Sequence, residues 1–468
     1  MNKVFNSPAE AIHDIRDGAS ILVGGFGVPQ AAPFSLLNAL KASGIGNLTV
    51  ICNTVAAGPG SPADLAEKRQ ISKLIAAFGA YSGFATAVDE QIQSGELELE
   101  LVPQGILCER LRAGAAGIPA FYSPTGIGTT VDTGKEQRSF NGKDHILENA
   151  LTADYAFIPA YKADTMGNLV YRRSSRNFNP VFATAARVTI AEVEEIVQPG
   201  QLDAESIVTP AIFVDRIVKA DMDRQVLFEE LKPLLSHRLV TGVKDQDSGL
   251  KPGLSRELIG LRVAKEFKPG DWVNLGAGIP AFVTQFLPDG VYVHTEVGLM
   301  APGGRPETDA EIDRDTYGAS GEFLTVAAGT SFCSNLEAFT MARGGRLTTT
   351  VLGAFQVSSK GDLANIWSPK MRAPGVGGAM DLLVGGARVI VAMEHRTESG
   401  ESRILEECEY PLTGKRCVSL IVTDLAVIRV TPDGLVLQET APGWSPPEVQ
   451  AVTGAKLIVS PDCREISL

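Results

Sequence analysis

Glu296 is the residue whose type and place in the sequence point most directly to chemistry. It closes the apolar, strand-like run Val291–Glu296 and is followed by Gly298 and by a turn rich in glycine and proline. A carboxylate at the end of a buried strand, beside a glycine, is placed to act on a bound ligand. A capping or ion-paired glutamate fits this segment equally well, so the rest of the chain has to decide between the two interpretations.

Two glycine-rich loops follow strand-like runs at matching places. The run 21–23 leads into Gly24-Gly-Phe-Gly27, and the run 272–275 leads into Gly276-Ala-Gly-Ile-Pro280. The second loop, with Glu296 about 20 residues further on, fits the dinucleotide pattern Gly-x-Gly-x-x-Gly/Ala, so a nicotinamide-binding protein is one alternative. The matching loop in the first half favours a duplicated scaffold.

A third glycine-rich segment, Gly375–Asp381, offers bare backbone N–H groups and close approach to a ligand. A tight turn packed against a sheet would need the same glycines. The sequence contains no Gly-x-x-x-x-Gly-Lys-Ser/Thr phosphate loop and no Gly-x-Ser-x-Gly elbow. P-loop nucleotidases and serine hydrolases therefore lose their usual sequence support.

The elements that must position these residues alternate along the chain. Short runs of Val, Ile and Leu at 48–52, 155–159 and 388–393 are separated by helical stretches, which predicts an α/β fold with mostly parallel sheets covered by helices. Strands that start from Gly95 and Gly345 look equivalent. The two halves are therefore predicted to be similar domains related by duplication.

Breaker residues and caps predict the boundaries. The segment 236–255 is rich in Gly, Pro and charge and is predicted to link domains 1–235 and 256–468. Ser7 and Pro8 predict an early helix, and 261–267 reads as the helix that opens the second half. The last ~50 residues are expected to add a hairpin at the sheet edge.

Composition describes an ordinary globular protein of 468 residues with 44% hydrophobic and 21% charged residues. A net charge of -13 argues against nucleic-acid and anionic membrane surfaces, and no apolar run reaches the ~18 residues of a membrane span. The start of the chain lacks signal-peptide and transit-peptide character.

The spacing of the cysteines and histidines bears on the cellular compartment and on metal binding. The six cysteines lie apart, which predicts reduced, mostly buried thiols in a cytoplasmic protein. The five histidines lack metal-ligand spacing, so no metal site is expected.

The chain resembles the family I CoA-transferases of the 3-oxoacid type, with alpha and beta subunits fused, over nearly its whole length. In the first half the resemblance rests on Gly24-Gly-Phe-Gly27, Pro103-Gln-Gly105, Glu109-Arg-Leu-Arg-Ala-Gly114, Gly117-Ile-Pro-Ala-Phe121 and Arg176-Asn-Phe-Asn-Pro180. In the second half it rests on Asn274-Leu-Gly-Ala-Gly-Ile-Pro280, Glu296-Val-Gly298, Lys360-Gly-Asp-Leu-Ala-Asn365, Gly377-Gly-Ala-Met-Asp381, Met393-Glu-His395 and Pro411-Leu-Thr-Gly-Lys415.

The resemblance implies a catalytic site shared between the halves. Glu296 would be the nucleophile that carries CoA as a glutamyl thioester, and the Gln104 side chain with the Gly378 N–H would stabilise the oxyanion. The residues implied to bind CoA and the acyl group are Gly25, Phe26, Gly27, Asn53, Asn274, Gly298 and Gly377. CoA would be a substrate and covalent intermediate, with no permanently bound cofactor.

The implied reaction moves CoA from an acyl-CoA such as succinyl-CoA to a 3-oxo acid such as acetoacetate or 3-oxoadipate, in a homodimer. Departures from the family pattern cluster at the site: Thr54 and Val297 replace asparagines, and a lysine is replaced within 318–322. An acyl-CoA hydrolase or lyase on the same fold stays open for this reason. A protein that only binds CoA esters is a third alternative.

Overall fold

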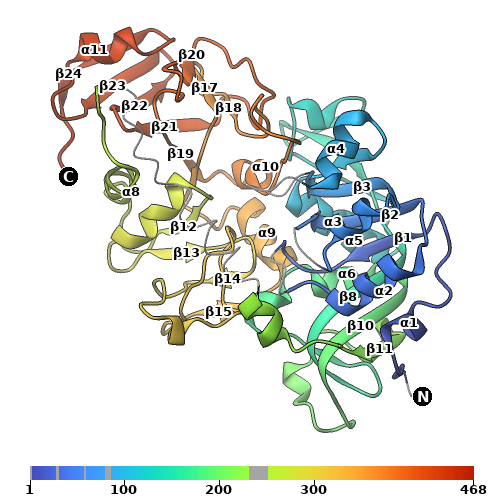
Figure 1. Cartoon of the computed structure of the whole chain (residues 1–468). Coiled ribbons are helices and arrows are strands. Elements are labelled where there is room, and N and C mark those ends of the chain that lie inside the picture. The colour runs from blue at the N-terminus through green and yellow to red at the C-terminus, as the bar shows by residue number, and fades with distance from the viewer. Residues whose placement is uncertain (1–2, 28–30, 57–59, 80–85, 231–250) are drawn as a thin grey trace.

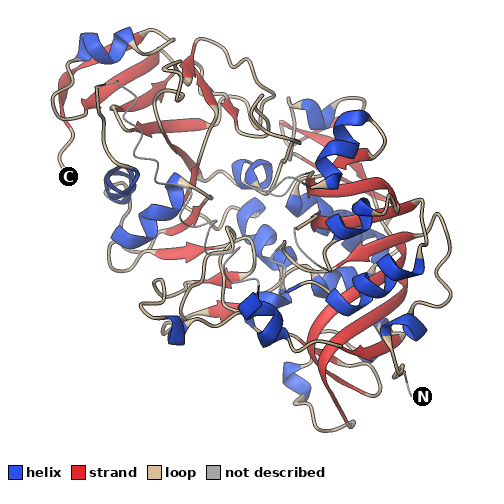
Figure 2. Ribbon diagram, viewed as in Figure 1, coloured by secondary structure: helices blue, strands red, loops and turns tan. Residues whose placement is uncertain are grey.

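The computed structural model describes residues 3–27, 31–56, 60–79, 86–230 and 251–468, which form two α/β halves. Each half is built on one large sheet, and helices α9 (Asn335–Arg343) and α10 (Ala379–Leu383) lie between the two sheets (Figure 1). Helices cover the sheets in both halves (Figure 2). The predicted fold class is therefore confirmed.

The first-half sheet has eight strands in the described residues, and the seven of its main path run parallel to one another. Their spatial order is β11 (Arg216–Lys219), β10 (Ala186–Val197), β8 (Ala153–Asp164), β1 (Ser20–Val23), β2 (Leu48–Thr54), β3 (Ile71–Phe78) and β4 (Glu98–Leu101), while β9 (Leu169–Val170) pairs antiparallel to β8.

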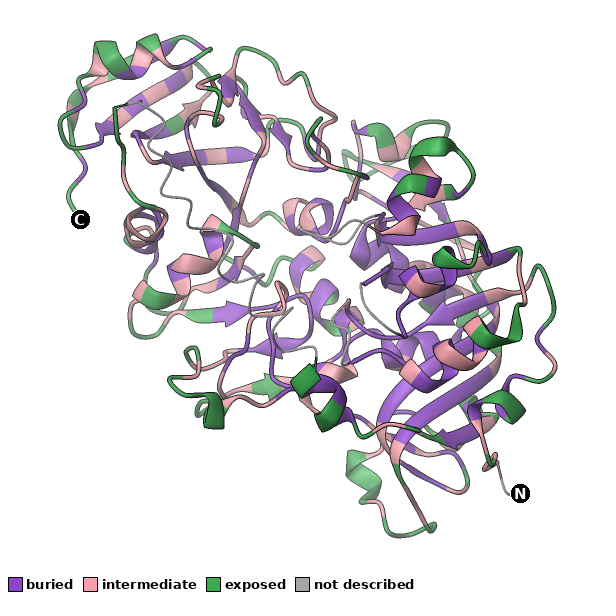
Figure 3. Ribbon diagram, viewed as in Figure 1, coloured by how far each residue is buried: buried purple, intermediate pink, exposed green. Residues whose placement is uncertain are grey.

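Alternation along these strands fills two cores, one on each face of the sheet. Val23 packs in one core and Leu22 in the other, because successive side chains of a strand point to opposite faces. One face is covered by α1 (Pro8–Ala11), α2 (Phe34–Ser43), α3 (Pro62–Glu67) and α4 (Ala87–Ser94). The other is covered by α5 (Gln104–Ala115), α6 (Asn179–Thr184) and residues of the second half, including Val297. Figure 3 shows the strands buried between these layers.

The second-half sheet has ten strands in the described residues. It is parallel at its centre and antiparallel toward both sides, except that the last two strands pair parallel. Their order is β15 (Ser331–Phe332), β14 (Leu299–Met300), β13 (Tyr292–His294), β12 (Trp272–Leu275), β16 (Thr349–Leu352), β19 (Arg388–Met393), β21 (Val418–Thr423), β22 (Ala426–Thr431), β23 (Gly434–Thr440) and β24 (Leu457–Glu465). Two further helices are α8 (Arg256–Ala264) and α11 (Pro446–Ala451).

Two small sheets complete the described fold. In the first half β5 (Ala120–Ser123), β7 (Lys143–Asn149) and β6 (Gln137–Phe140) pair antiparallel. In the second half β17 (Gln356–Ser358) pairs with β18 (Leu363–Ala364) and β20 (Ile404–Leu405).

The two large sheets share one plan around their first strands. β1 lies between β2 and β8, and β12 lies between β13 and β16; each is followed by a glycine-rich loop. The predicted equivalence of the strands after Gly95 and Gly345 is wrong, however. β4 is an edge strand three places from β1, whereas β16 pairs directly with β12. Both strands follow a helix that ends at glycine, but the chain then crosses to different positions in the two sheets.

Local signals fixed some element boundaries and missed others. Ser7 caps α1 by accepting from the Glu10 N–H at 3.2 Å, as predicted, and β22 and β23 form the predicted hairpin. A helix opens the second half as predicted, but the predicted limits 261–267 are wrong. The helix spans Arg256–Ala264, because Ser255 caps an earlier start by accepting from the Leu258 N–H.

The domain limits stay a prediction. β11 ends at Lys219 and α8 begins at Arg256, and most of the predicted linker lies in 231–250, outside the described residues. Within the residues that the structure describes, no helix is long and apolar enough to cross a membrane.

The six cysteines are all described and all free. Only Cys52 and Cys108 are buried, so the expectation of mostly buried thiols is wrong: the other four are partly exposed. Burial raises the pKa of Cys52 to about 12, and a thiol that keeps its proton is a poor nucleophile.

Candidate active site

Glu296 does not close a strand as predicted; it lies in the turn that connects β13 to antiparallel β14. The turn closes because the Thr295 hydroxyl accepts from the Leu299 N–H at 3.1 Å and donates to its carbonyl at 2.9 Å. Gly298 has a φ of +94°, and a β-carbon there would lie 2.1 Å from the Cys333 carbonyl oxygen. A glycine is therefore required by packing at this position.

The Glu296 carboxyl is buried and incompletely satisfied. Glu296 is 7% exposed, and the Oε2 atom of its carboxyl has no hydrogen-bond partner among the described residues. Burial is the main cause that raises its pKa to about 7, and the charge of Glu322 acts in the same direction. Hydrogen bonds from the Asn274 amide and from its own backbone N–H oppose this shift. A desolvated carboxylate without full hydrogen bonding is a strong nucleophile.

His294 fixes the orientation of Asn274 beside the carboxylate. The ring is fully buried, and its Nε2 lies 2.9 Å from the Ala338 carbonyl oxygen, which can only accept. Nε2 therefore carries the proton, and Nδ1 accepts from Asn274 Nδ2 at 3.2 Å. Burial lowers the pKa of His294 to about 4, so the ring is neutral at pH 7. Asn274 Nδ2 also donates to the His294 carbonyl at 3.2 Å, so His294 holds the predicted binding residue Asn274 in place.

Gln104 is the first residue of α5 and is buried. Its Nε2 donates to Asn53 Oδ1 at 2.8 Å, and Asn53 Nδ2 donates to the Phe26 carbonyl at 3.3 Å. The Phe26 carbonyl can only accept, so this chain of bonds fixes both amides and turns the Gln104 nitrogen toward Asn53. Among the described residues, only one of the two Gln104 side-chain N–H groups has an acceptor, and an oxyanion donor requires the other to be available.

Gly377 and Gly378 approach the first half more closely than any side chain would allow. The Gln104 N–H donates to the Gly377 carbonyl at 2.9 Å. A β-carbon on Gly377 would lie 2.7 Å from Phe78, and one on Gly378 would lie 2.9 Å from Gln104 Oε1. Gly378 is the N-cap of α10, so its N–H has no acceptor within its own helix. The structure therefore brings the two residues that are predicted to supply the oxyanion donors close together.

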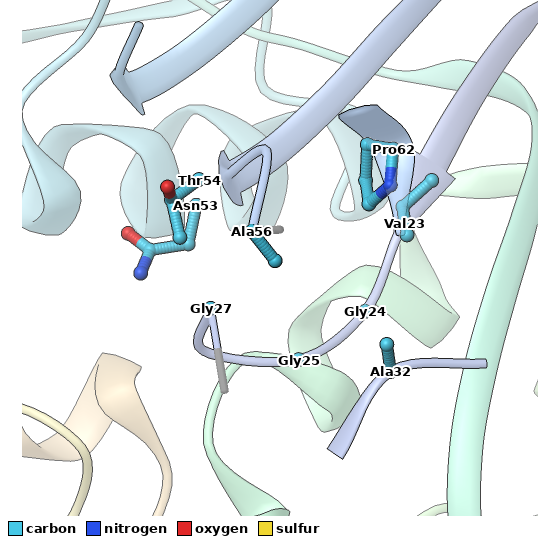
Figure 4. Close-up of a pocket in the computed structure, with 9 residues that line it drawn as sticks. All are labelled: Val23, Gly24, Gly25, Gly27, Ala32, Asn53, Thr54, Ala56 and Pro62. Atoms are coloured by element: carbon cyan, nitrogen blue, oxygen red, sulfur yellow. The ribbon is translucent and has the colours of Figure 1, made fainter. Parts of the chain in front are cut away.

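The glycine loop after β1 and the end of β2 enclose a small cavity. Its volume of about 10 Å³ suits a single water molecule, and Figure 4 shows Asn53 and Thr54 facing the loop that carries Gly25 and Gly27. The lining residues are Val23, Gly24, Gly25, Gly27, Ala32, Asn53, Thr54, Ala56 and Pro62. Three of the predicted binding residues therefore come together here.

Phe26, the remaining predicted residue of this loop, is buried and stacks on Phe178 with ring centroids 6.0 Å apart. Its side chain holds the loop in the core, and its carbonyl oxygen accepts from Asn53. Gly25 is held in turn by its N–H, which donates to Asn179 Oδ1 at 3.1 Å.

Asn335 and Asn177 connect the nucleophile to the first half, and sequence reasoning gave neither a role at the site. Asn335 is the first residue of α9, and its amide donates to the Glu296 carbonyl oxygen. Its own N–H donates to the Asn177 carbonyl at 3.2 Å. The pattern of Ser334 and Glu337 signals a capping box, which marks the start of α9 but not its contacts.

The same helix reaches the oxyanion donors one turn later. A β-carbon on Gly378 would lie 2.9 Å from the Phe339 ring. Helix α9 therefore contacts the Glu296 turn through Asn335 and the start of α10 through Phe339. Glu296, Gln104 and Gly378 therefore lie around one helix at the junction of the two halves, as Figure 1 shows for α9, α5 and α10.

A profile of the coenzyme A transferase family matches residues 5–220 and 256–451. The chain belongs to the coenzyme A transferase family. The match includes both halves in a single polypeptide, which confirms the resemblance stated from the motifs, and the protein is a CoA-transferase enzyme.

Known relatives are similar in sequence to the whole chain or to one of its halves. Succinyl-CoA:3-ketoacid coenzyme A transferase 2, mitochondrial, of Homo sapiens is 39% identical over 484 residues, covering 99% of this chain and 91% of the human protein. One subunit of the succinyl-CoA:3-ketoacid coenzyme A transferase of Helicobacter pylori (strain J99) is 48% identical over 221 residues, covering 47% of this chain and 94% of the bacterial polypeptide.

A solved structure supports the architecture. The crystal structure of an acyl-CoA transferase from Escherichia coli O157:H7, in a thioester complex with CoA, has a TM-score of 0.79 and 20% identity, covering 100% of this chain and 95% of that chain. At this identity the likeness concerns the fold, and it extends over both halves.

Proposed function

We propose that this CoA-transferase moves CoA from succinyl-CoA to a 3-oxo acid such as acetoacetate or 3-oxoadipate, through a glutamyl-CoA thioester on Glu296. The observation that carries the proposal is the buried Glu296 carboxyl, whose Oε2 has no partner among the described residues. The names of the human and Helicobacter pylori relatives support the pair of substrates.

The proposed steps conserve the thioester energy. The Glu296 carboxylate attacks the acyl-CoA carbonyl and expels CoA thiolate, which leaves a mixed anhydride on the enzyme. The thiolate then attacks the Glu296 carbonyl and releases the donor carboxylate, which gives glutamyl-CoA. The acceptor carboxylate reverses both steps, so CoA leaves on the new acyl group and Glu296 is regenerated.

Each attack passes through a tetrahedral oxyanion, for which Gln104 and Gly378 are the proposed donors. The bond from Gln104 to Asn53 at 2.8 Å orients the amide before the charge develops. Donors that are fixed in advance contribute most, because they need no reorganisation in the transition state. We assign CoA and acyl contacts to Gly25, Phe26, Gly27, Asn53, Asn274, Gly298 and Gly377, as the resemblance implies.

The apolar neighbours of Glu296 favour transfer over hydrolysis. Val297 and Leu299 are fully buried in the main core of the first half. Apolar packing around the turn that carries Glu296 limits the entry of water to the site. This apolar packing supports a glutamyl-CoA thioester that survives until the acceptor arrives.

The test is to incubate the protein briefly with succinyl-CoA in the absence of an acceptor. We expect a species heavier by one CoA minus one water, which peptide mapping places on Glu296. Steady release of free thiol, with no adduct and no acceptor present, would contradict the transferase proposal and favour an acyl-CoA hydrolase.

We further propose that the enzyme works as a homodimer in the cytoplasm. The family resemblance supports the dimer, and the six free cysteines support a reducing compartment. Light scattering after size-exclusion chromatography would measure the mass in solution, and fractionation of the source cells would locate the protein.

A further inference from the structure

Asp381 lies between the two groups proposed to stabilise the oxyanion. It is in the first turn of α10, three residues after Gly378, and it is fully buried. Its Oδ2 accepts from the backbone N–H of Gly105 at 2.8 Å, and Gly105 directly follows Gln104. One carboxylate on α10 therefore holds the start of α5.

The other carboxylate oxygen is occupied as well. Asp381 Oδ1 accepts from Arg343 Nη1 at 3.1 Å and from the Thr125 hydroxyl at 3.3 Å. Arg343 also donates from Nη2 to Glu109 Oε1 at 2.7 Å, so the guanidinium bridges carboxylates from both halves. These contacts connect α5, α9 and α10 in one network that is buried at Asp381 and partly buried at Arg343 and Glu109.

The network leaves little freedom in how α5 meets α10. A β-carbon on Gly105 would lie 2.2 Å from Arg343 Nη1 and 2.5 Å from Asp381 Oδ1. Two hydrogen bonds fix this approach: Gln104 N–H to the Gly377 carbonyl at 2.9 Å, and Gly105 N–H to Asp381. The first is between backbones, and the second depends on the Asp381 side chain.

We infer that Asp381 is a positioning residue that sets the distance between the Gln104 amide and the Gly378 N–H, so that both reach one oxyanion. The inference rests on the proposed roles of Gln104 and Gly378 in CoA transfer. The two donors come from different halves of the chain, so no single element fixes their separation. A misplacement of about 1 Å at a catalytic centre costs on the order of 10²-fold in rate.

The experiment is a double-mutant cycle of Asp381→Asn with Gln104→Ala, measured as kcat and KM for CoA transfer. Asparagine has the same shape as aspartate but cannot accept on both sides. In the wild-type background, we expect Asp381→Asn to lower kcat at least about 10-fold and to change KM by less than about threefold. In the Gln104→Ala background, the same substitution should lower kcat by less than about threefold further. Arg343→Lys, which keeps the charge but cannot bridge Asp381 and Glu109, serves as a milder second variant with the same expected coupling.

Asp315→Asn is the matched control, because Asp315 is another buried carboxylate that joins the halves, through Arg172 Nη1 at 2.7 Å. Asp315→Asn and Gln104→Ala are expected to act independently, so that the loss of kcat in the double variant equals the product of the two single losses. If the loss of kcat in the Asp381→Asn, Gln104→Ala double variant equals the product of the two single losses, the positioning role is wrong while the proposed oxyanion role stands. If Gln104→Ala by itself leaves kcat unchanged, both the oxyanion role and this inference are wrong.

Discussion

Two buried carboxylates at the junction of the halves, Glu296 and Asp381, have opposite surroundings. Burial raises the pKa of both. Asp381 is met by an arginine, a hydroxyl and a backbone N–H, whereas Glu296 Oε2 meets no donor among the described residues. The same residue chemistry is thus used once to hold the structure together and once to remain reactive.

The difference shows how the site divides its tasks. A carboxylate whose lone pairs are occupied is a weak nucleophile, and one whose lone pairs are free destabilises the fold. The second half keeps Glu296 on a tight turn with few hydrogen bonds to its carboxylate, while Asp381 fixes the elements that bring Gln104 to it. Three substitutions, which give four predictions, would break or sharpen this contrast.

The largest effect is expected from Glu296→Gln. An amide cannot form the anhydride, so CoA transfer should fall by about four powers of ten or more while the protein stays folded. Steady-state transfer assays and circular dichroism would measure the two properties. Glu322→Gln is the control, since it removes a nearby charge and keeps the nucleophile; a comparable loss in that variant would remove the distinction assigned to Glu296.

Gln104→Ala comes next. Loss of one oxyanion donor should lower kcat by about 10²- to 10³-fold with little change in KM, because the donor acts mainly on the transition state. Gln70→Ala removes another buried glutamine, one that donates to Leu40 and Ile45 carbonyls away from the site, and should leave kcat near normal. A change confined to KM would show that Gln104 binds substrate instead.

Glu296→Gln should also stabilise the fold at high pH. The folded-state pKa of about 7 lies above the ordinary 4.5, so between these values the folded state keeps a proton that the unfolded state has lost. The wild type therefore loses stability as pH rises from about 4.5 to 7 and stays at that lower level above 7, by up to roughly 3 kcal/mol.

Urea denaturation at pH 5 and pH 8 would test this effect. The glutamine variant should exceed the wild type by roughly 3 kcal/mol at most at pH 8, and by less than about 1 kcal/mol at pH 5. An advantage that is equal at both pH values would mean that the Glu296 pKa is not raised in the folded protein.

Thr125→Val should give the smallest effect. It removes the longest of the three hydrogen bonds to Asp381, at 3.3 Å, and should cost about 1 kcal/mol of stability with kcat within about threefold. Thr129→Val is the local control, because its hydroxyl donates to the Gly126 carbonyl and not to Asp381. A tenfold loss of kcat at Thr125 would mean that Asp381 tolerates much less movement than the geometry indicates.

The sequence by itself determined the α/β class, the two halves and the motif residues. Apolar runs between helical stretches are a local signal, so β2 and β19 were found near their true limits, whereas the predicted run 155–159 covers only the middle of β8. The identity of the nucleophile and of the oxyanion donors followed from motif resemblance, and their roles remain predictions.

Only the tertiary structure decided what surrounds those residues. The strands after Gly95 and Gly345 carry the same local signal and occupy different places in their sheets, because crossover connections depend on the packing of the whole half. The contacts of Asn335 with Glu296 and of Asp381 with Gly105 join residues separated by 39 and 276 positions. Periodicity and capping report on neighbours within a few residues, so contacts at such separations are set only when the two halves pack together.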